Sequence, residues 1–233
     1  IGPNGSGKTT LLKNISKTLQ PNCKTVFIED MDLTDMKNRD VACKIACVPQ
    51  NTQVDFDFSV MDIVLMGRSP YIRRFHTESR EDIEIATKAM EVTNTWHLRD
   101  KNINHISGGE RQRVIIARAL AQETDIMLLD EPVSQLDIHH QIEIMDTVRS
   151  LIDCSGITVL TILHDLNLAA QYSDYIVLIN EGMIVSQGRP EQVITKENIE
   201  KVYKLEVHVM VNPVNGKPHV IPIRGGRVDA ETG

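Results

Sequence analysis

The chain has 233 residues, of which 41% are hydrophobic and 24% are charged, and its formal net charge is −7. This length and composition are those of one large globular domain with a sizeable core. The acidic balance argues against nucleic acid as the main partner, because binding a phosphate backbone requires clustered Lys and Arg. The sequence contains no apolar run of the ~18 residues that would suggest a membrane span.

The four cysteines are spaced unlike metal ligands of the CxxC kind. We expect them to be reduced thiols in or near the core, as is usual in an intracellular protein. They are Cys23, Cys43, Cys47 and Cys154.

Residues 2–9 read GPNGSGKT, a full match to the pattern G-x-x-x-x-G-K-[ST]. The glycines let backbone N–H groups converge on phosphate oxygens without a Cβ in the way. We expect Lys8 to reach the β- and γ-phosphates and the Thr9 hydroxyl to bind Mg²⁺. A helix expected over Thr10–Leu19 points its positive end at the same anion, so the motif predicts a P-loop nucleoside triphosphatase. The residues predicted to bind phosphate are Gly2, Pro3, Asn4, Gly5, Ser6, Gly7, Lys8, Thr9 and Thr10.

A P-loop normally follows a β-strand, but only Ile1 precedes Gly2. We therefore expect the chain to begin in the middle of a domain, either as a fragment or with upstream residues missing. Such a start would leave out the part of the protein that stacks on a nucleotide base.

Short elements follow the first helix. A β-prone run at Thr25–Ile28 and a polar helix at Lys37–Lys44 precede an apolar strand at Ile45–Val48. Gln50 comes directly after this strand and Pro49. Its amide could ligate a metal or position a water molecule, and a solvated surface glutamine is the simpler alternative.

Residues 51–122 change character and predict helices without strands. Apolar residues recur at helical spacing over Val60–Met66 and again over Glu78–Val92. We expect these apolar faces to belong to the core. The aromatic side chains that could instead contact a partner, beside the acidic Asp55, are Phe56, Phe58 and Tyr71.

The segment His105–Asp137 places two phosphate-handling features next to each other. The turn Ser107–Glu110 opens a helix that ends near Gln122, and the apolar run Ile126–Leu129 predicts a buried strand. Two carboxylates follow this strand directly. Asp130 can hold Mg²⁺ through water, and Glu131 can polarise an attacking water.

A second α/β unit continues from this strand. A helix expected over Ile138–Leu151 leads to a strand at Thr158–Leu163, which ends at His164. Ligands of parallel sheets bind at the carboxyl ends of the strands. A lone histidine there is as often structural as functional. Together with the P-loop and the acidic strand end, the functional interpretation of His164 is favoured.

The last third of the chain predicts two hairpins and two short helices. The hairpins are expected from Tyr175–Asn180 with Met183–Ser186, and from the alternating run after Leu205 with His219–Ile223. The helices are expected over Pro190–Val193 and Glu197–Tyr203. We expect the last ten residues, Arg224–Gly233, to be frayed.

These motifs, in this order and spacing, resemble the ATP-binding subunit of an ABC transporter over nearly the whole chain. The resemblance identifies Gly2–Thr9 as the Walker A loop, Gln50 as the Q-loop glutamine, Ser107–Glu110 as the signature, Asp130 and Glu131 as the Walker B acid and catalytic glutamate, Ser134–Asp137 as the D-loop and His164 as the switch histidine.

The resemblance implies an α/β fold with a RecA-like P-loop NTPase core, a mainly parallel sheet and an inserted ABC helical subdomain. It places the core at residues 1–50 and 123–190, the helical subdomain at 51–122 and a C-terminal extension at 191–233. The aromatic residue that stacks on the base in this family lies upstream of the P-loop, so it is not assigned to a residue of this sequence. Ile106 replaces the usual leucine before the signature, a conservative change.

The implied cofactors are ATP and Mg²⁺. The implied catalytic residues are Glu131, His164, Gln50 and Lys8, and the implied Mg²⁺ ligands are Thr9, Gln50 and Asp130. The residues implied to bind the nucleotide of a second subunit are Ser107, Gly108, Gly109, Glu110 and Asp137.

The resemblance also implies a head-to-tail homodimer with two ATP molecules between the subunits. The chain supplies a physical reason for it, because the turn at Ser107–Glu110 and the following helix N-terminus form a second anion site. The P-loop already binds the chain's own triphosphate, so this second site is best used on the γ-phosphate held by the partner subunit. The other implied partners are an integral-membrane permease that docks near Phe56–Tyr71 and, indirectly, a substrate-binding protein, with the ATPase peripheral on the cytoplasmic side of the cell membrane.

Several stretches are similar to importer ATPases for iron–siderophore, haem or cobalamin uptake. They are Val60–Tyr71, Ser107–Gln122 and Leu163–Asp174, together with the ending Asn212–Pro222. Zinc and manganese importer ATPases share much of this sequence and remain an alternative. A soluble ABC-type ATPase of DNA repair, ribosome function or cofactor assembly is a further alternative, and a GTPase is disfavoured because the N-K-x-D guanine-binding motif is missing.

Overall fold

The computed structural model describes residues 1–51, 56–73 and 76–227. Asp55 and the terminal residues 228–233, which belong to two of the segments singled out above, lie outside this range. The chain forms two compact units, one of Ile1–Leu11 with Ile162–Gly233 and the other of Leu12–Thr161. The boundary between the two units, after Leu11, falls within helix α1 (Lys8–Ile15). The three-part division expected from the sequence stays a prediction.

A three-stranded sheet lies at the centre of the Leu12–Thr161 unit, in the order β3 (Ile45–Val48), β4 (Ile126–Asp130), β5 (Thr158–Ile162). Strands β3 and β4 pair in parallel, with Val48 opposite Leu129. The middle of β4 is buried on both faces, which is what its unbroken apolar run predicted. The α/β fold class and the parallel sheet are therefore confirmed.

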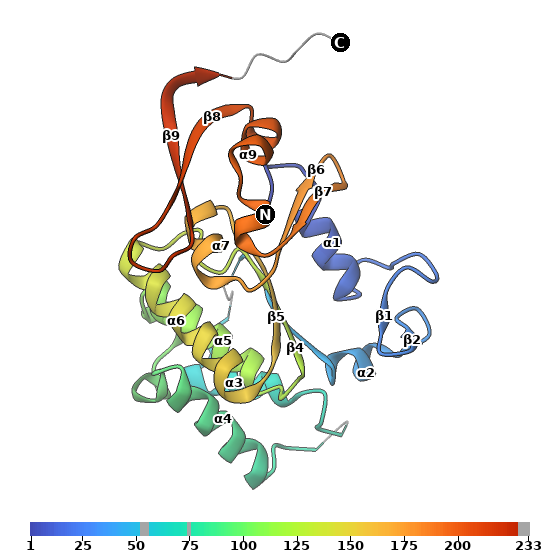
Figure 1. Ribbon diagram of the computed structural model, residues 1–233. Coiled ribbons are helices and arrows are strands. Elements are labelled where there is room, and N and C mark those ends of the chain that lie inside the picture. Colours follow the sequence, from blue (N-terminus) through green and yellow to red (C-terminus); the bar gives the residue numbers. More distant parts are fainter. Residues whose placement is uncertain (52–55, 74–75, 228–233) are drawn as a thin grey trace. The chain divides into compact units, whose positions relative to one another are not determined.

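Helices α3 (Val60–Leu65), α4 (Arg80–Val92) and α5 (Gly108–Leu120) pack against one another in the same unit (Figure 1). Their apolar faces form a core that includes the fully buried Val60, Met90 and Ile116, as predicted. The other helical segments of this unit are α2 (Asn38–Ala42), η1 (Met66–Arg68), η2 (Trp96–Leu98), η3 (Ile103–His105) and α6 (Ile138–Ser155).

Arg68 links three segments in the helical part of this unit through buried polar contacts. Its side chain is buried and forms an ion pair with Asp82 at 2.9 Å and a hydrogen bond to the carbonyl of Ala121 at 2.7 Å. Hydrogen bonds from Ser79, and then the Arg68 guanidinium, hold the pKa of Asp82 below its usual value. A buried charge is tolerated only when it is paired in this way, so η1, α4 and the end of α5 are held together.

Some predicted boundaries are wrong by a few residues. Helix α1 begins at Lys8 and ends at Ile15, whereas Thr10–Leu19 was predicted, because the P-loop runs directly into the helix and Lys17 adopts a left-handed φ of 57°. The strand expected at Thr25–Ile28 is reduced to β1 (Phe27–Ile28), which pairs with β2 (Met31–Asp32).

The other unit is built on two hairpins. Strands β6 (Ile176–Asn180) and β7 (Met183–Gly188) pair antiparallel, and so do β8 (Leu205–Val211) and β9 (Pro218–Arg227). Both hairpins are confirmed, but Arg224–Arg227, which were expected to be frayed, continue β9. The helices of this unit are α7 (Leu166–Tyr172), α8 (Pro190–Val193) and α9 (Lys196–Tyr203).

Ile1 lies beside β6, directly before the P-loop. Its amino group donates to the carbonyl of Val177, and its carbonyl accepts from the N–H of Ile179, both at 2.9 Å. None of the helices in the described part of the chain is long and apolar enough to cross a membrane.

Candidate functional site

The P-loop is a tight turn that depends on its glycines. Gly2, Gly5 and Gly7 have φ angles of 150°, 78° and 100°, a range that other residues rarely adopt. A Cβ on Gly2 would lie 2.1 Å from the carbonyl oxygen of Ile179, so the loop packs directly on β6. A larger residue at this position would displace the loop.

Lys8 folds back over this loop. Its ammonium group donates to the carbonyls of Gly2 and Pro3, at 2.8 Å each, and lies 3.4 Å from the Ser6 hydroxyl. The Lys8 side chain is buried, and it is also the first residue of α1. A buried cation therefore lies inside a glycine-rich loop at a helix N-terminus, which is an arrangement that fits a phosphate chain.

Gln50 and Glu131 lie together just beyond the ends of the adjacent strands β3 and β4. The Gln50 amide donates to a carboxylate oxygen of Glu131 at 2.6 Å. Glu131 has a left-handed φ of 53°, so the chain turns sharply there and Asp130 remains buried as the last residue of β4. The sequence left two interpretations of Gln50 open, a functional amide and a solvated surface side chain. The structure gives this amide a specific partner, Glu131, at the predicted acidic strand end.

The predicted Mg²⁺ ligands have the right chemistry for that ion. Gln50 and Asp130 supply an amide and a carboxylate oxygen in the Leu12–Thr161 unit, and Thr9 of the other unit would supply a hydroxyl. Mg²⁺ prefers oxygen ligands and takes few of them from the protein. Within the described ranges, no three His, Cys, Asp or Glu side chains form a metal-binding group. Each of these residues therefore carries an oxygen donor of the kind that Mg²⁺ prefers, and their joint role as its ligands stays a prediction.

The signature turn is a helix cap. The N–H of Ser107 donates to the Glu110 carboxylate at 2.7 Å, and the Ser107 hydroxyl oxygen accepts from the N–H of Glu110 at 3.3 Å. These bonds from Ser107 lower the pKa of Glu110. Ser107 and Glu110 therefore form a capping box at the start of α5.

His140 connects the signature turn to the D-loop, and the sequence reasoning missed it. Its backbone N–H donates to an Asp137 carboxylate oxygen at 3.0 Å, and its Nδ1 lies 2.8 Å from the other oxygen. Its ring lies against Gly109, where an added Cβ would be 2.5 Å from the ring carbon Cδ2. The D-x-x-H spacing from Asp137 was the only signal in the sequence, and it does not indicate the contact with Gly109.

We expect His140→Ala to reduce ATP hydrolysis about 5-fold, a typical loss for one residue that couples two parts of a site. The change removes the Nδ1 contact with Asp137 and opens space beside Gly109, but it leaves the P-loop intact. The affinity of the monomer for nucleotide is therefore expected to be unchanged. Steady-state hydrolysis and nucleotide titration measure the two quantities. His139→Ala is the control, because the His139 side chain is 76% exposed and contacts Glu143 instead. Equal losses in both variants would contradict the role of His140.

His164 lies in the segment between β5 and α7, next to the Asp165 cap. The Asp165 carboxylate accepts from the N–H groups of Asn167 and Leu168, at 2.7 and 3.0 Å. His164 is exposed and belongs to the same unit as the P-loop, whereas Gln50, Asp130, Glu131, Ser107 and Asp137 belong to the Leu12–Thr161 unit. Each predicted motif therefore has a defined local structure within its own unit.

Comparisons with known proteins define the class. A family model described as "ABC transporter" matches residues 1–134. The chain is 41% identical to the ferric enterobactin transport ATP-binding protein FepC of Escherichia coli, covering 96% of this chain and 82% of that protein. It is 37% identical to the petrobactin import ATP-binding protein FpuD of Bacillus anthracis (97% and 83%) and 40% identical to the hemin import ATP-binding protein HmuV of Gloeobacter violaceus (98% and 84%). The chain therefore belongs to the ABC transporter family, as one of its ATP-binding, ATP-hydrolysing domains.

Solved structures agree with this assignment. A metal-chelate-type ABC transporter in an inward-facing conformation matches with a TM-score of 0.82 and 29% identity, covering 96% of this chain and 85% of that one. The ATP-binding cassette MJ0796, solved as a dimer bound to ADP and Pi, matches with a TM-score of 0.69 and 27% identity, covering 81% and 82%.

Proposed function

We propose that the chain is the ATP-hydrolysing subunit of an importer for an iron(III)–siderophore or a similar metal chelate such as haem or cobalamin. The observation that carries this proposal is the similarity to FepC, FpuD and HmuV along nearly the full length of the chain. ATP hydrolysis by this subunit would drive transport through a partner permease, with a substrate-binding protein acting on the far side.

The P-loop would bind the triphosphate of ATP. Lys8 already lies buried inside the loop, and it would exchange its contacts with Gly2 and Pro3 for phosphate oxygens. Thr9, Gln50 and Asp130 would hold Mg²⁺, which supplies charge neutralisation at the transferring phosphoryl group. The P-loop, Lys8 and these Mg²⁺ ligands would also position the phosphates for the reaction.

Glu131 would orient or deprotonate the attacking water. The hydrogen bond from Gln50 supports this role, because it fixes the position of the carboxylate. Gln50 would in turn report the state of the nucleotide to the helices that follow it. His164 would stabilise the γ-phosphate, because a histidine at the end of a strand can donate a hydrogen bond there.

The signature turn would bind the γ-phosphate of the nucleotide in the partner subunit of a homodimer. The Ser107 hydroxyl and the N-terminus of α5 would form the anion site. The position of Asp137, tied to this turn through His140, supports placing the D-loop at the same interface. Dimer closure would then depend on the γ-phosphate and would be released by hydrolysis.

We expect Ser107→Arg to block the closed dimer and to reduce hydrolysis about 100-fold, a typical cost for losing one donor to transition-state charge. Binding of ATP to the monomer should be unchanged, because the P-loop is not altered. Size-exclusion chromatography with light scattering and nucleotide titration measure the two effects. Ser79→Arg is the matched control, because Ser79 forms the same capping box at the start of α4. Loss of ATP binding by the Ser107→Arg monomer would contradict the role in trans.

Exposed apolar side chains of the Leu12–Thr161 unit support a docking surface for the permease. Phe56, Met66 and Tyr71 are 69%, 40% and 38% exposed, and they lie in or next to the helical part of the Leu12–Thr161 unit. The subunit would then be peripheral on the cytoplasmic side of the cell membrane. Co-purification with a multi-span membrane protein tests this point, and its failure would favour a soluble ABC-type ATPase.

A further inference from the structure

Helix α7 begins at Leu166, two residues after His164, and its first turn is tied to the C-terminal hairpin (Figure 1). The tie is the side-chain amide of Asn167. Its Oδ1 accepts from the N–H of Val220 at 2.7 Å, and its Nδ2 donates to the carbonyl of the same residue at 3.2 Å. These residues all belong to the unit that contains the P-loop. The Asn167 side chain therefore pairs with β9 as the backbone of a neighbouring strand would.

The sequence of β9 makes this pairing position specific. Val220 lies opposite Val209 of β8, and Pro218 and Pro222 lie two residues to either side of it. Alternate residues of a strand direct their N–H groups to the same edge, so each proline lacks the donor that this edge would otherwise present. Between the two prolines, Val220 is the residue that supplies an N–H to this edge, and Asn167 accepts it.

The same turn of α7 follows the predicted switch histidine directly. Asp165 caps the helix by accepting from the N–H groups of Asn167 and Leu168. Leu163, on the other side of His164, is buried in the core. His164 itself is exposed, so core packing does not fix its side chain. The position of His164 therefore depends on buried Leu163 before it and on the turn Asp165–Asn167 after it.

A histidine that donates to a γ-phosphate has to be placed accurately, because a displacement of about 1 Å in a site can cost about 100-fold in rate. The two bonds between Asn167 and Val220 are suited to this restraint. Val220 is 5% exposed, so water cannot readily replace Asn167 as the partner of its backbone groups. Loss of the amide would leave both groups without a partner and would loosen the turn that follows His164.

A second polar side chain ties the same hairpin through another strand and another helix. The N–H of Val207 on β8 donates to a carboxylate oxygen of Glu200 on α9 at 3.0 Å. Glu200 also pairs with Lys196 at 3.7 Å. If Asn167 did no more than attach the hairpin, Glu200 would be its equivalent. The two side chains therefore separate a role in anchoring β8 and β9 from a role in placing His164.

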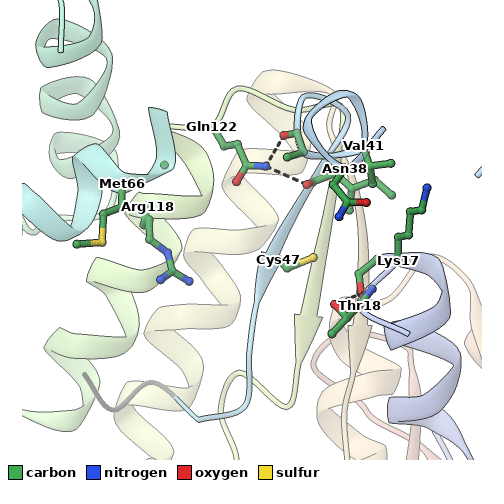
Figure 2. A pocket seen from close by; sticks show the side chains of 12 residues that line it. Lys17, Thr18, Asn38, Val41, Cys47, Met66, Arg118 and Gln122 are labelled. Carbon is green, nitrogen blue, oxygen red and sulfur yellow. Dashed lines mark hydrogen bonds between the residues drawn. The ribbon is translucent and has the colours of Figure 1, made fainter. Parts of the chain in front are cut away.

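An amide side chain also makes two backbone hydrogen bonds in the Leu12–Thr161 unit. Gln122 donates to the carbonyls of Ala42 and Ile45 (dashed lines in Figure 2). Its acceptors are the last residue of α2 and the first residue of β3. Gln122 thus matches Asn167 in the kind and number of its bonds, but it belongs to the other unit and ties no predicted nucleotide-binding residue.

The P-loop is held by contacts that do not involve α7 or β9. The N–H of Gly182, in the turn between β6 and β7, donates to the carbonyl of Ser6 at 3.0 Å. The N–H of Ile179 on β6 donates to the carbonyl of Ile1. Loss of the Asn167 side chain should therefore leave the binding of ATP unchanged and affect the hydrolysis step alone.

We propose that Asn167 is a positioning residue for ATP hydrolysis, which pairs with Val220 and thereby uses the β8–β9 hairpin to hold His164 in place for the γ-phosphate. The inference rests on the proposed function for the role of His164. It adds a part for the C-terminal hairpin in the hydrolysis step. Asn167 acts through His164 and does not contact the nucleotide.

The test uses the full chain. Asn167→Ala should lower kcat about 10-fold, the lower end of the range for residues that orient a site residue, with wild-type ATP affinity by titration. Asn167→Asp keeps an acceptor for the Val220 N–H but cannot donate to its carbonyl, so it should lower kcat about 3-fold. Glu200→Ala and Gln122→Ala are the controls, and both should hydrolyse ATP like wild type. Thermal melting of each variant shows that it is folded at the assay temperature.

The decisive measurement is a double-mutant cycle with His164. His164→Ala alone should lower kcat about 100-fold, a typical cost for losing one donor to transition-state charge. Asn167→Ala added to it should lower kcat no further, whereas independent effects would multiply to about 1,000-fold. If Asn167→Ala does not fold, the same cycle with Asn167→Asp decides the question.

Four results would overturn the inference while leaving the proposed function intact. They are a wild-type kcat in Asn167→Ala, a loss confined to ATP affinity, an equal loss of kcat in Glu200→Ala, and multiplicative losses in the cycle with His164. A wild-type kcat in His164→Ala would instead refute the role that the proposed function gives to this histidine, and the inference with it.

Discussion

Glu131→Gln is expected to bind ATP with unchanged affinity and to hydrolyse it about 10²–10⁴-fold more slowly, the range lost when a general base is removed. The substitution removes the charge that would activate water. It keeps an oxygen that can accept the hydrogen bond from Gln50, which is 2.6 Å long in the native protein. The fold should therefore be preserved, and ATP should remain uncleaved in the closed dimer.

Two measurements check this expectation. Phosphate release gives the rate, and light scattering after incubation with ATP gives the mass of the particle, which should be that of a dimer. Glu84→Gln is the control, because this exposed carboxylate on α4 pairs only with Arg80 among the contacts described. A Glu131→Gln protein that stays monomeric and turns over ATP at the normal rate would refute its assignment as the catalytic glutamate.

Lys8→Ala is expected to weaken ATP binding about 100-fold or more, comparable to the loss of one partner from a desolvated charge pair. The change removes the buried cation of the P-loop. It also removes the three contacts by which Lys8 holds Gly2, Pro3 and Ser6 in place. Both effects lower the affinity for the triphosphate, and hydrolysis should fall with it.

Isothermal titration calorimetry with ATP measures this affinity directly. Lys13→Ala is the matched control, because Lys13 lies on the same helix but is exposed in its last turn. Tight binding of ATP by Lys8→Ala would contradict the interpretation of residues 2–9 as a P-loop, whatever the rate of hydrolysis.

The features that the sequence predicted well are those set by local patterns. Strand β4 was found because Ile126–Leu129 is an unbroken apolar run, and the antiparallel partner of β6 because a two-residue turn follows Asn180. The start of α5 followed from the S-x-x-E spacing of Ser107 and Glu110, which is a capping box in the structure. In each case neighbours in the sequence determine the element.

The features that were missed depend on residues far apart in the chain. The contact between His140 and Gly109 joins two helix starts, and no periodicity in either helix indicates it. Asp82 and Glu123, which pair with the buried Arg68, lie 14 and 55 residues from it in the sequence. The sequence also placed β9 too short, because its pairing with β8 carries the strand on to Arg227.

The central claim is that ATP hydrolysis by this chain drives uptake of a metal chelate. Its most direct test is the accumulation of ⁵⁵Fe-labelled ferric siderophore in proteoliposomes that contain the permease, the substrate-binding protein and this subunit on its ATP-accessible side. We predict uptake that requires ATP and stops with Glu131→Gln. ATP hydrolysis without uptake of a ferric siderophore, haem or cobalamin, but with uptake of free zinc or manganese, would contradict the claim.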